Sequence, residues 1–248
     1  MDKIAVISDI HGNMTALEAV LADIWAQDVE TIYCLGDLIG KGPSGAAAID
    51  RCREVCDAVV LGNWDDFICT GELNEVSQWH YDRLGRSRVE YLVNLPHTID
   101  LVMSGRHVRL YHASQTSVHH RVHPFMPFEK LLAMFDNTDF TGHEHPQPDV
   151  VGYGDIHAAY MLPIYDHQKT LFNTGSVGNP LDEPTASYVI LTGTRGETKK
   201  TRFSLDIVRV AYDIDAAIEE ARASEMPLLE PYENELRTAI YRGRKKAE

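Results

Sequence analysis

The sequence predicts an α/β protein in which two sheets pack against each other with helices on the outside. Strands and helices alternate through residue 63, which indicates βαβ units and a parallel sheet. The later part of the chain reads as mostly antiparallel strands. The 248 residues, 44% of them hydrophobic, are enough for one sizeable core. We therefore predict a single domain over residues 1–248.

The first half of the chain alternates between short apolar runs and helical patterns. The run "KIAVIS" is rich in β-branched residues and predicts a buried strand over 3–8. Apolar residues then recur on one helical face, which predicts an amphipathic helix over 13–27. These residues are Leu17, Val20, Leu21, Ile24 and Trp25. A strand over 31–37, a helix over 44–54 and a strand over 57–63 complete this half.

The pattern changes after residue 63. A helix is predicted over about 75–94, ending before Pro96, and "TIDLVM" followed by "HVRLYHA" predicts a hairpin. The remaining predicted elements are a helix near 128–135, strands within 139–145, 158–165, 169–175, 186–193 and 202–210, and a C-terminal helix over about 213–247. The basic end "RGRKKAE" is expected to fray.

Composition limits the classes of function. The net charge of −14, from 37 acidic and 23 basic residues, argues against nucleic acid or an anionic membrane as the main partner. The chain has no run of about 18 apolar residues and no cleavable signal pattern, so we expect a soluble, cytoplasmic protein. The four cysteines match neither a redox C-x-x-C motif nor a zinc ribbon, and are expected to be reduced and structural. An anionic substrate would need local positive charge, which bound metal ions would supply.

Seven polar side chains follow the ends of five predicted strands. They are Asp9, His11, Asp37, Asn63, His112, His143 and His145. Binding sites of open α/β sheets form beyond the carboxyl ends of the strands. A single aspartate at such a place is more often a helix cap, and a single histidine is usually a core or surface residue. The ordered set, each member closing a strand, is hard to explain as turns, so we predict metal ligands.

Five short motifs carry these residues in order: "DIHGN" (9–13), "GDLIGKGP" (36–43), "GNWDD" (62–66), "YHAS" (111–114) and "GHEH" (142–145). Together they resemble the calcineurin-like metallophosphoesterases, and the later stretch "NTGSVGNP" (173–180) is similar to a block of the bacterial phosphodiesterase branch. The resemblance extends from residue 3 to about 210. It implies a four-layer α/β/β/α sandwich of two packed mixed sheets, and a metal-dependent phosphoester hydrolase with two metal ions.

The resemblance also implies how the ligands divide between the two metals, with Asp37 bridging them. One metal would be held by Asp9, His11 and His145, and the other by Asn63, His112 and His143. Carboxylate, amide and imidazole ligands suit two divalent or trivalent ions of manganese, iron, zinc, cobalt or nickel, and the lack of cysteine ligands argues against structural zinc. A water bridging both ions would become the attacking hydroxide near neutral pH. Asp37, Asn63 and His112 are the residues expected to carry the catalysis.

Trp64 stands where much of the family has a histidine that protonates the departing oxygen, oriented by the residue at position 65. An indole is a hydrogen-bond donor only and does not titrate usefully. Since general acid catalysis contributes about 10²–10⁴ in rate, we expect a preference for good leaving groups, such as nucleotides and polyphosphates. "GNWDD" is similar to the form found in a subgroup that cleaves dinucleoside polyphosphates such as diadenosine tetraphosphate. The indole could also stack on a nucleobase.

Five residues are candidates for contacts with a small, nucleotide-like phosphorylated substrate. They are Trp64, Asp65, His120, Arg121 and Ser176. The histidine-rich loop over 114–125 either supplies a replacement proton donor or is simply solvated. Ser176 and its neighbouring amides either support the site, hold a phosphate or form an ordinary glycine turn. Family members often have a basic residue after the last proline of that block. This chain has Leu181 there, which argues against a charged substrate contact at this position.

Two other functions share parts of this pattern. A serine/threonine phosphoprotein phosphatase would use the same ligands, but the missing histidine at position 64 and the short chain weigh against it. A non-catalytic scaffold that binds a partner protein would be expected to have lost several ligands, and all seven are present. The lack of a G-x-G-x-x-G after the first strand argues against a dinucleotide-binding module.

Overall fold

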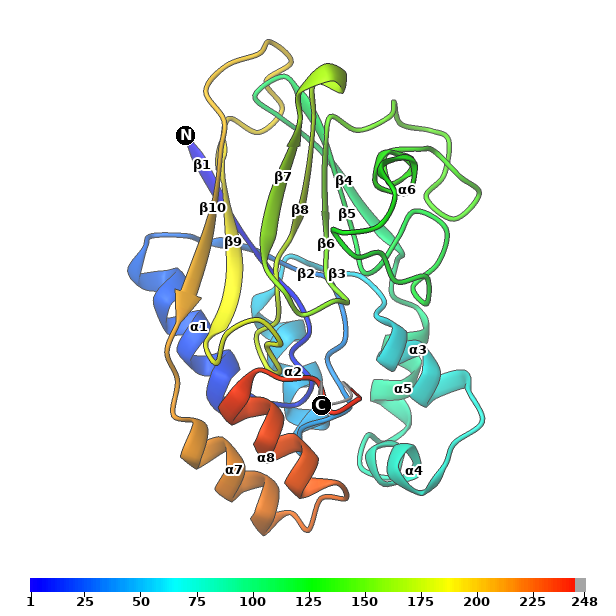
Figure 1. The fold of residues 1–248 in the computed structure, drawn as a ribbon, viewed down its shortest axis with the longest axis vertical. Helices are drawn as coiled ribbons and strands as arrows, with labels where there is room; N and C mark the ends of the chain where they lie inside the picture. Colours follow the sequence, from blue (N-terminus) through cyan, green and yellow to red (C-terminus); the bar gives the residue numbers. More distant parts are fainter. Residues whose placement is uncertain (244–248) are drawn as a thin grey trace.

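Two five-stranded sheets lie face to face in the molecule (Figure 1). The computed structural model describes residues 1–243. Its elements in chain order are β1 (Asp2–Ile7), α1 (Met14–Ala26), β2 (Thr31–Cys34), α2 (Gly45–Val55), β3 (Ala58–Val59), α3 (Asn63–Thr70), α4 (Glu75–Tyr81), α5 (Arg86–Val93), β4 (Thr98–Met103), β5 (Arg106–Tyr111), α6 (Phe128–Ala133), β6 (Val150–Tyr153), β7 (Tyr160–Ile164), a 3₁₀ turn (Tyr165–His167), β8 (Lys169–Asn173), β9 (Ala186–Gly193), β10 (Ser204–Val210), α7 (Ile214–Ala223) and α8 (Leu229–Thr238).

Both sheets are mixed. The first has the strand order β10-β9-β1-β2-β3, in which β1, β2 and β3 run parallel and the other two pair antiparallel. The second has the order β4-β5-β6-β8-β7, in which β5, β6 and β8 run parallel. The prediction of a mostly antiparallel second half was therefore only partly right, because β6 runs parallel to both of its neighbours, β5 and β8. Two sets of parallel strands consequently place their carboxyl ends at the same end of the molecule.

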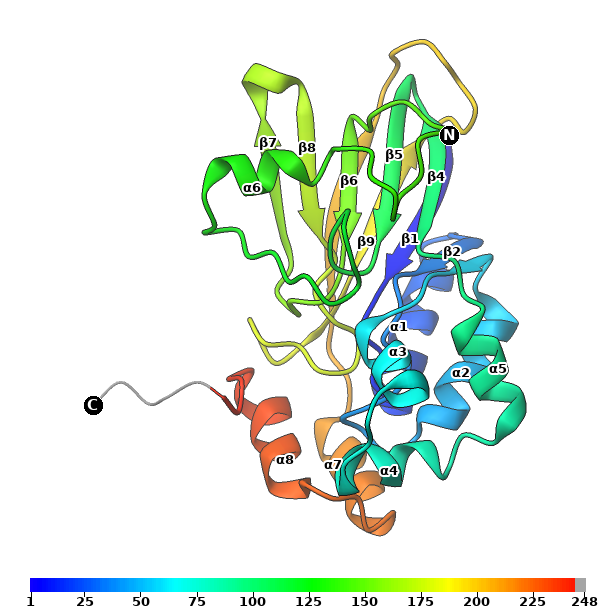
Figure 2. The same ribbon diagram turned by 90° about the vertical axis from the view of Figure 1, so that its right-hand side faces the viewer.

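Three hydrophobic cores separate four layers (Figure 2). One core packs α1 and α2 on the first sheet through residues such as Leu17 and Ile49. A second fills the space between the sheets, with Val6 from β1 and Leu110 from β5. The third lies under α6, where Leu131 packs near Val151. The predicted α/β/β/α sandwich is confirmed, although its outermost layer over the second sheet is only one short helix and its flanking loops.

Several predicted elements differ from the structure. The helix expected over about 75–94 is interrupted at Gly85, whose positive φ of 72° breaks it into α4 and α5. The segment from Asn63 forms the unpredicted helix α3, which begins immediately after Gly62. No strand forms within 139–145, where the chain makes turns; the strand of this region is β6 at 150–153, buried along its whole length.

The C-terminal region forms two helices rather than the one expected over about 213–247. The break lies at Leu228, which has a left-handed backbone with φ of 59°. Tyr232 and Leu236 of α8 pack with Ile218 of α7 in a small separate cluster. Figure 2 shows both helices beneath the carboxyl ends of the strands. The expected fraying of "RGRKKAE" concerns residues that lie mostly outside the described range.

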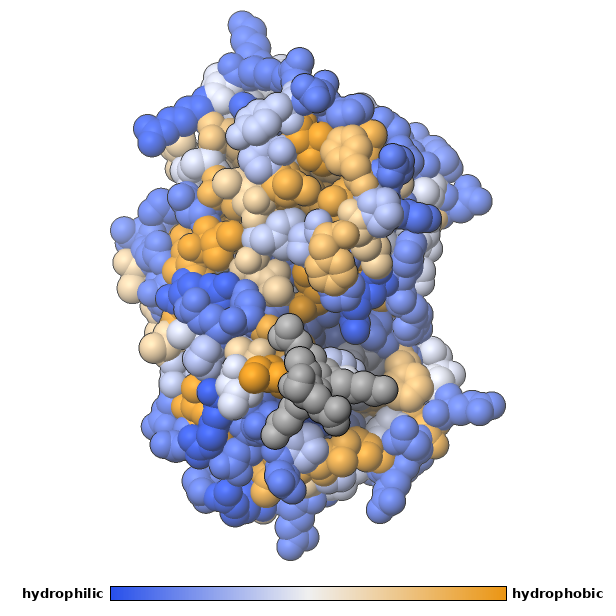
Figure 3. Space-filling view, in the orientation of Figure 1, coloured by the Kyte–Doolittle hydropathy of each residue, from blue (hydrophilic) through white to orange (hydrophobic). Residues whose placement is uncertain are grey.

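Surface features agree with the composition. Hydrophilic side chains cover most of the rim of the face seen in Figure 3, and hydrophobic ones gather near its middle. Trp25, expected on the buried side of α1, is 47% exposed. Cys34, Cys52, Cys56 and Cys69 are all free thiols. Within residues 1–243, every helix is too short or too polar to span a membrane.

Candidate metal centre at the strand ends

Two Asp-x-His turns of the same backbone shape follow β1 and β6. Asp9 and His11 have φ angles of 55° and 51°, and Asp155 and His157 have 62° and 58°. Asp37, at the end of β2, shares this shape with a φ of 55°. Residues other than glycine rarely adopt positive φ, and such strained conformations cluster at functional sites. The repeated strain therefore marks the meeting point of β1, β2 and β6.

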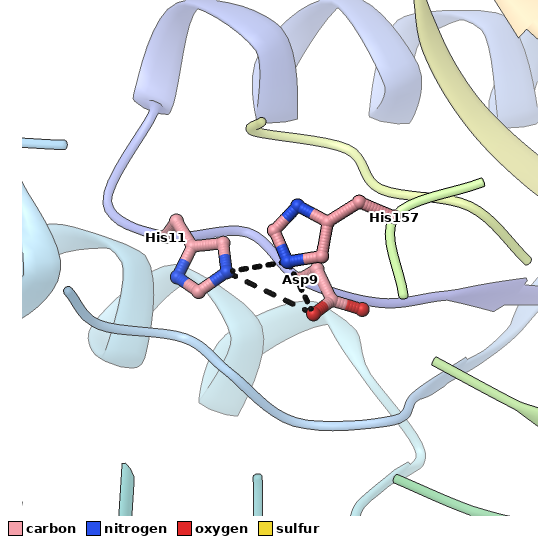
Figure 4. Close-up of side chains that lie close together, drawn as sticks. All are labelled: Asp9, His11 and His157. Carbon is pink, nitrogen blue, oxygen red and sulfur yellow. Dashed lines mark hydrogen bonds and ion pairs between the residues drawn. The ribbon is translucent and has the colours of Figure 1, made fainter. Parts of the chain in front are cut away.

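The first group of donor atoms comes from both turns (Figure 4). His11 Nε2 lies 3.1 Å from His157 Nε2 and 3.7 Å from Asp9 Oδ1, and His157 Nε2 lies 3.2 Å from the same oxygen. Asp37 Oδ2 approaches His11 Nε2 to 3.6 Å. All four side chains are nearly inaccessible to solvent. Donor atoms that share one metal at about 2.0–2.2 Å stand roughly 3 Å apart, so this spacing suits an ion.

A second group of donor atoms lies on the other side of Asp37. The side-chain oxygen of Asn63 lies 2.9 Å from His112 Nε2 and 3.2 Å from both Asp37 Oδ2 and Asp155 Oδ1. His112 Nε2 is also 3.5 Å from Asp37 Oδ1 and 4.0 Å from Asp155 Oδ1. An oxygen surrounded by acceptors is unfavourable unless the amide is turned to present its NH₂ group or a cation lies among them. Carboxylate, amide and imidazole groups that meet in this way are also donors that suit a transition-metal ion.

The three clustered histidines are held in the same way. His11 Nδ1 bonds to the carbonyl of Ile39 at 3.0 Å, His112 Nδ1 to that of Leu35 at 2.7 Å, and His157 Nδ1 to that of Asn179. A carbonyl can only accept, so each Nδ1 donates its proton. Each Nε2 therefore points into the cluster, where its lone pair can bind a metal once that nitrogen carries no proton, which is how histidine ligands are commonly oriented.

Electrostatics distinguish the two groups. Burial lowers the pKa of His11 well below its usual range, so this imidazole is neutral at pH 7. Burial alone would raise the pKa of Asp9, but the imidazoles around it, led by His157, lower it. Burial also raises the pKa of Asp37. In His112, burial opposes protonation, yet the carboxylates of Asp37, Asp9 and Asp155 raise the pKa to about 9.

An unpartnered buried atom tests whether the residues fit a metal. Asp9 Oδ1 is buried and has no hydrogen-bond partner, although its carboxylate is ionised. The nearest cationic group to this oxygen is the imidazole of His157, whose Nε2 lies 3.2 Å away, and a bound cation would pair the buried charge more fully. The same holds for the mutually facing Nε2 atoms of His11 and His157. The donor set of oxygen and imidazole nitrogen fits transition-metal ions such as manganese, iron or zinc.

The structure brings together five of the seven predicted ligands and leaves two elsewhere. Asp9, His11, Asp37, Asn63 and His112 converge as described. The side chain of His143 is 63% exposed and contacts Asp139, and His145 is also exposed. The expectation that His143 and His145 complete the site is therefore corrected: their turn does not follow a buried strand, so nothing carries them to the sheet edge.

The positions expected for those two residues are filled by Asp155 and His157, which the sequence reasoning missed. The signal was present, because "VVGY" (150–153) is an apolar strand and "GDIH" (154–157) follows it directly. The segment repeats the Asp-x-His spacing of residues 9–11. The side chain of Asn173 donates to the carbonyl of Gly154 at 2.6 Å and steadies this turn.

A cavity of about 650 Å³ opens beside the cluster. Of the predicted substrate contacts, Trp64 and Arg121 line it, together with Asp155 and His157. The indole of Trp64 meets the His11 ring edge-on at 6.0 Å, and its backbone N–H donates to Asp37 Oδ1 at 2.8 Å. Arg121 makes two hydrogen bonds to Asp155, at 2.7 and 2.8 Å.

The other three predicted substrate contacts lie away from this cavity. Asp65 is buried and accepts the backbone N–H groups of Asp37, Leu38 and others, so it shapes the loop after β2. Ser176 is buried and donates to the carbonyl of Asp9 at 2.8 Å, which supports the first turn. His120 is exposed and bonds to Thr116. These three side chains therefore support or surround the site and do not line the cavity.

Fold and donor set together define a class: a four-layer α/β/β/α protein with transition-metal ligands at the meeting strand ends. Residues 2–196 match the calcineurin-like phosphoesterase superfamily domain. The chain is 30% identical over 239 residues to the uncharacterized protein MJ0912 of Methanocaldococcus jannaschii, covering 90% of this chain and 93% of that one. The chain therefore belongs to the calcineurin-like phosphoesterase superfamily, and as a member it is a metal-dependent phosphoester hydrolase.

Two further comparisons extend this result. A metallophosphoesterase from Sphaerobacter thermophilus has the same fold, with a TM-score of 0.77 and 23% identity over 96% of this chain and 99% of that chain. A stretch of 62 residues is 42% identical to the symmetrical bis(5'-nucleosyl)-tetraphosphatase of Acidovorax ebreus, covering 24% of this chain and 22% of that protein.

Proposed function

We propose that this protein is a dinuclear-metal phosphodiesterase or dinucleoside polyphosphate hydrolase. Asp37 lies between the two groups of ligands. The first metal is assigned to Asp9, His11 and His157, and the second to Asn63, His112 and Asp155. The observation that supports this most is the pair of facing Nε2 atoms beside the unpartnered Asp9 oxygen, because this arrangement is unfavourable without a cation.

The metals, when bound, would supply a water of lowered pKa as nucleophile and neutralise charge on the phosphoryl group. The chain holds the ligands in place before substrate arrives: carbonyls fix the three imidazoles, and Asp65 fixes the loop that carries Asp37. Such preorganisation is a major part of electrostatic catalysis. No serine, threonine or cysteine nucleophile is needed.

The substrate is proposed to be nucleotide-like with a good leaving group. Trp64 lines the cavity in place of a titrating histidine, so departing groups that need no protonation are favoured. Its ring is placed to stack on a base. The partial similarity to a bis(5'-nucleosyl)-tetraphosphatase supports dinucleoside polyphosphates as the first class to test. A serine/threonine phosphoprotein phosphatase and a non-catalytic scaffold are the competing functions.

The test is a substrate panel with Mn²⁺, containing bis-p-nitrophenyl phosphate, diadenosine tetraphosphate, p-nitrophenyl phosphate and a phosphoserine peptide. We expect metal-dependent cleavage of the diester and the tetraphosphate that is lost on chelation and restored by Mn²⁺. Good turnover of the phosphopeptide with negligible cleavage of the tetraphosphate would favour the phosphatase. Metal binding without turnover of any substrate would favour the scaffold.

A further inference from the structure

Among the lysines and arginines of residues 1–243 that line the cavity, Lys41 is the one without an ion pair. Three basic side chains line the cavity: Lys41, Arg121 and Arg242. Arg121 is paired with Asp155, and Arg242 with Glu235 at 2.6 Å. Within residues 1–243, Lys41 forms no ion pair; its Nζ donates to the side-chain oxygen of Asn179 at 2.7 Å. Its ammonium group therefore remains available for an anion.

The backbone of Lys41 is fixed from two sides. A Cβ at Gly40 would lie 2.5 Å from the ring of Trp64, and one at Gly42 would lie 2.9 Å from the hydroxyl of Tyr232 in α8. Lys41 itself has a positive φ of 61°. Only the flanking glycines allow both aromatic residues to pack this closely, so the loop cannot easily shift. Strained residues held this way are typical of binding sites.

Asn179 connects Lys41 to the cluster of candidate metal ligands. Its backbone carbonyl accepts the Nδ1 proton of His157, while its side-chain oxygen accepts from Lys41. The ammonium group is consequently placed on the His157 side of the cluster, within the same cavity. A ligand that reaches the cluster there passes next to Lys41.

The C-terminal helix supports this arrangement. Glu235, fully buried in α8, accepts from Asn179 at 3.3 Å and from Arg242 at 2.8 Å. Lys41 Nζ lies 5.7 Å from the centre of the Tyr241 ring, in the range of a cation–π contact. Helices α7 and α8 lie beyond residues 2–196, which match the family domain. The residues on either side of α8, among them Leu228 and Tyr241, thus line the cavity, and Tyr241 lies close to the ammonium group of Lys41.

We propose that Lys41 forms a second anion position, which binds the phosphoryl group next to the one held at the metals. This inference rests on the proposed function and narrows it, since the substrates it selects are organic diphosphates and polyphosphates rather than simple phosphodiesters. A protonated ammonium donating to a phosphate oxygen gives a strong, charge-assisted hydrogen bond. The neighbouring aromatic rings of Trp64 and Tyr241 suit the organic part of such a molecule.

The test uses two nucleotides that differ by one phosphoryl group, AMP and the non-hydrolysable α,β-methylene-ADP. Their affinities for the Mn²⁺-loaded full-length protein are measured by titration calorimetry. We expect the wild type to bind the diphosphate at least about tenfold more tightly than AMP. Lys41→Met should reduce this ratio to about twofold or less, and Lys41→Arg should largely preserve it.

Controls distinguish loss of the anion position from loss of folding and from failure of the proposed function. Lys130→Met removes one exposed charge on α6 and should leave the ratio unchanged. Lys41→Gln provides a second neutral variant, and metal content and Tm establish that each variant is folded. An unchanged ratio in Lys41→Met, or no preference in the wild type, overturns the second anion position. Turnover of bis-p-nitrophenyl phosphate is measured separately, and its absence counts against the proposed function instead.

Discussion

Two turns of this chain have the same spacing of polar residues but very different surroundings. In each turn a glycine stands before two polar residues that are two positions apart: Gly142 before His143 and His145, and Gly154 before Asp155 and His157. A Cβ at Gly154 would lie 2.1 Å from Ser8 Oγ and 2.7 Å from Asp9 Oδ2, so the ends of β6 and β1 meet there. A Cβ at Gly142 would approach only the flexible side chain of Glu144. The first glycine serves a local turn, and the second allows two distant segments to touch.

The difference shows that the strand before a motif, rather than the residue types in the motif, decides whether its side chains reach the site. β6 is buried on both faces and lies between β5 and β8, so its carboxyl end is fixed near those of β1 and β2. The turn at 142–145 lacks such a strand, and its histidines face solvent.

Removing one imidazole from each turn should give the strongest contrast. His157→Ala deletes a donor that lies 3.1 Å from His11 Nε2, and we expect Mn²⁺-dependent hydrolysis of bis-p-nitrophenyl phosphate to decrease at least about 100-fold. The matched variants His143→Ala and His145→Ala alter exposed side chains, and should retain activity within about twofold. Metal content after purification is measured for all three. The opposite pattern would return the ligand role to the 142–145 turn.

Much of the fold was predictable because it follows from local patterns. The first alternating strands and helices, the β4–β5 hairpin and the later strands lie close to their expected positions. The misplaced elements had weaker signals: a single glycine such as Gly85 does not by itself end a helical pattern, and the strand before "GDIH" is only four residues long. Short apolar runs do not by themselves separate strand from turn.

The site was predictable where each ligand ends a strong strand, as with Asp9 and Asp37. It was not predictable where side chains depend on contacts between distant segments. Asp65 lies close in sequence to Asn63, yet its carboxylate accepts backbone N–H groups of the loop around Asp37 and of Gly62. Ser176 likewise supports Asp9 across more than half of the chain. Only tertiary packing determines whether such polar residues face the cavity or the backbone.

Adding one methyl group to each glycine tests the same contrast on the backbone. Gly154→Ala would force the ends of β1 and β6 apart, and overpacking of this kind costs about 1–3 kcal/mol of unfolding free energy. Gly142→Ala strains a positive φ of 80° and should cost about 1–2 kcal/mol. Denaturant unfolding measures both. The two variants should differ in Mn²⁺ affinity, which we expect to decrease only for Gly154→Ala. An equal decrease in Mn²⁺ affinity in both variants would contradict the proposed contact.

The last predicted effect is a pH dependence of metal affinity, which is expected for the buried cluster but not for the exposed turn at 142–145. Because nearby carboxylates raise the pKa of His112 from 6.5 to about 9, this residue is protonated at pH 7 in the metal-free protein. Metal binding must release that proton, so affinity should increase about tenfold per pH unit until pH approaches about 9.

The stability of the metal-free protein should change in the opposite direction. A folded-state pKa above the unfolded value stabilises the protein below about pH 6.5, and this contribution is lost as pH rises through about 9. The increase in Tm on adding Mn²⁺ should therefore be larger at about pH 8 than at about pH 6.5. Calorimetry in buffers of different ionisation enthalpy counts the released protons. If wild type released none, or if His143→Ala changed the number, His112 would not be the group that exchanges its proton for the metal.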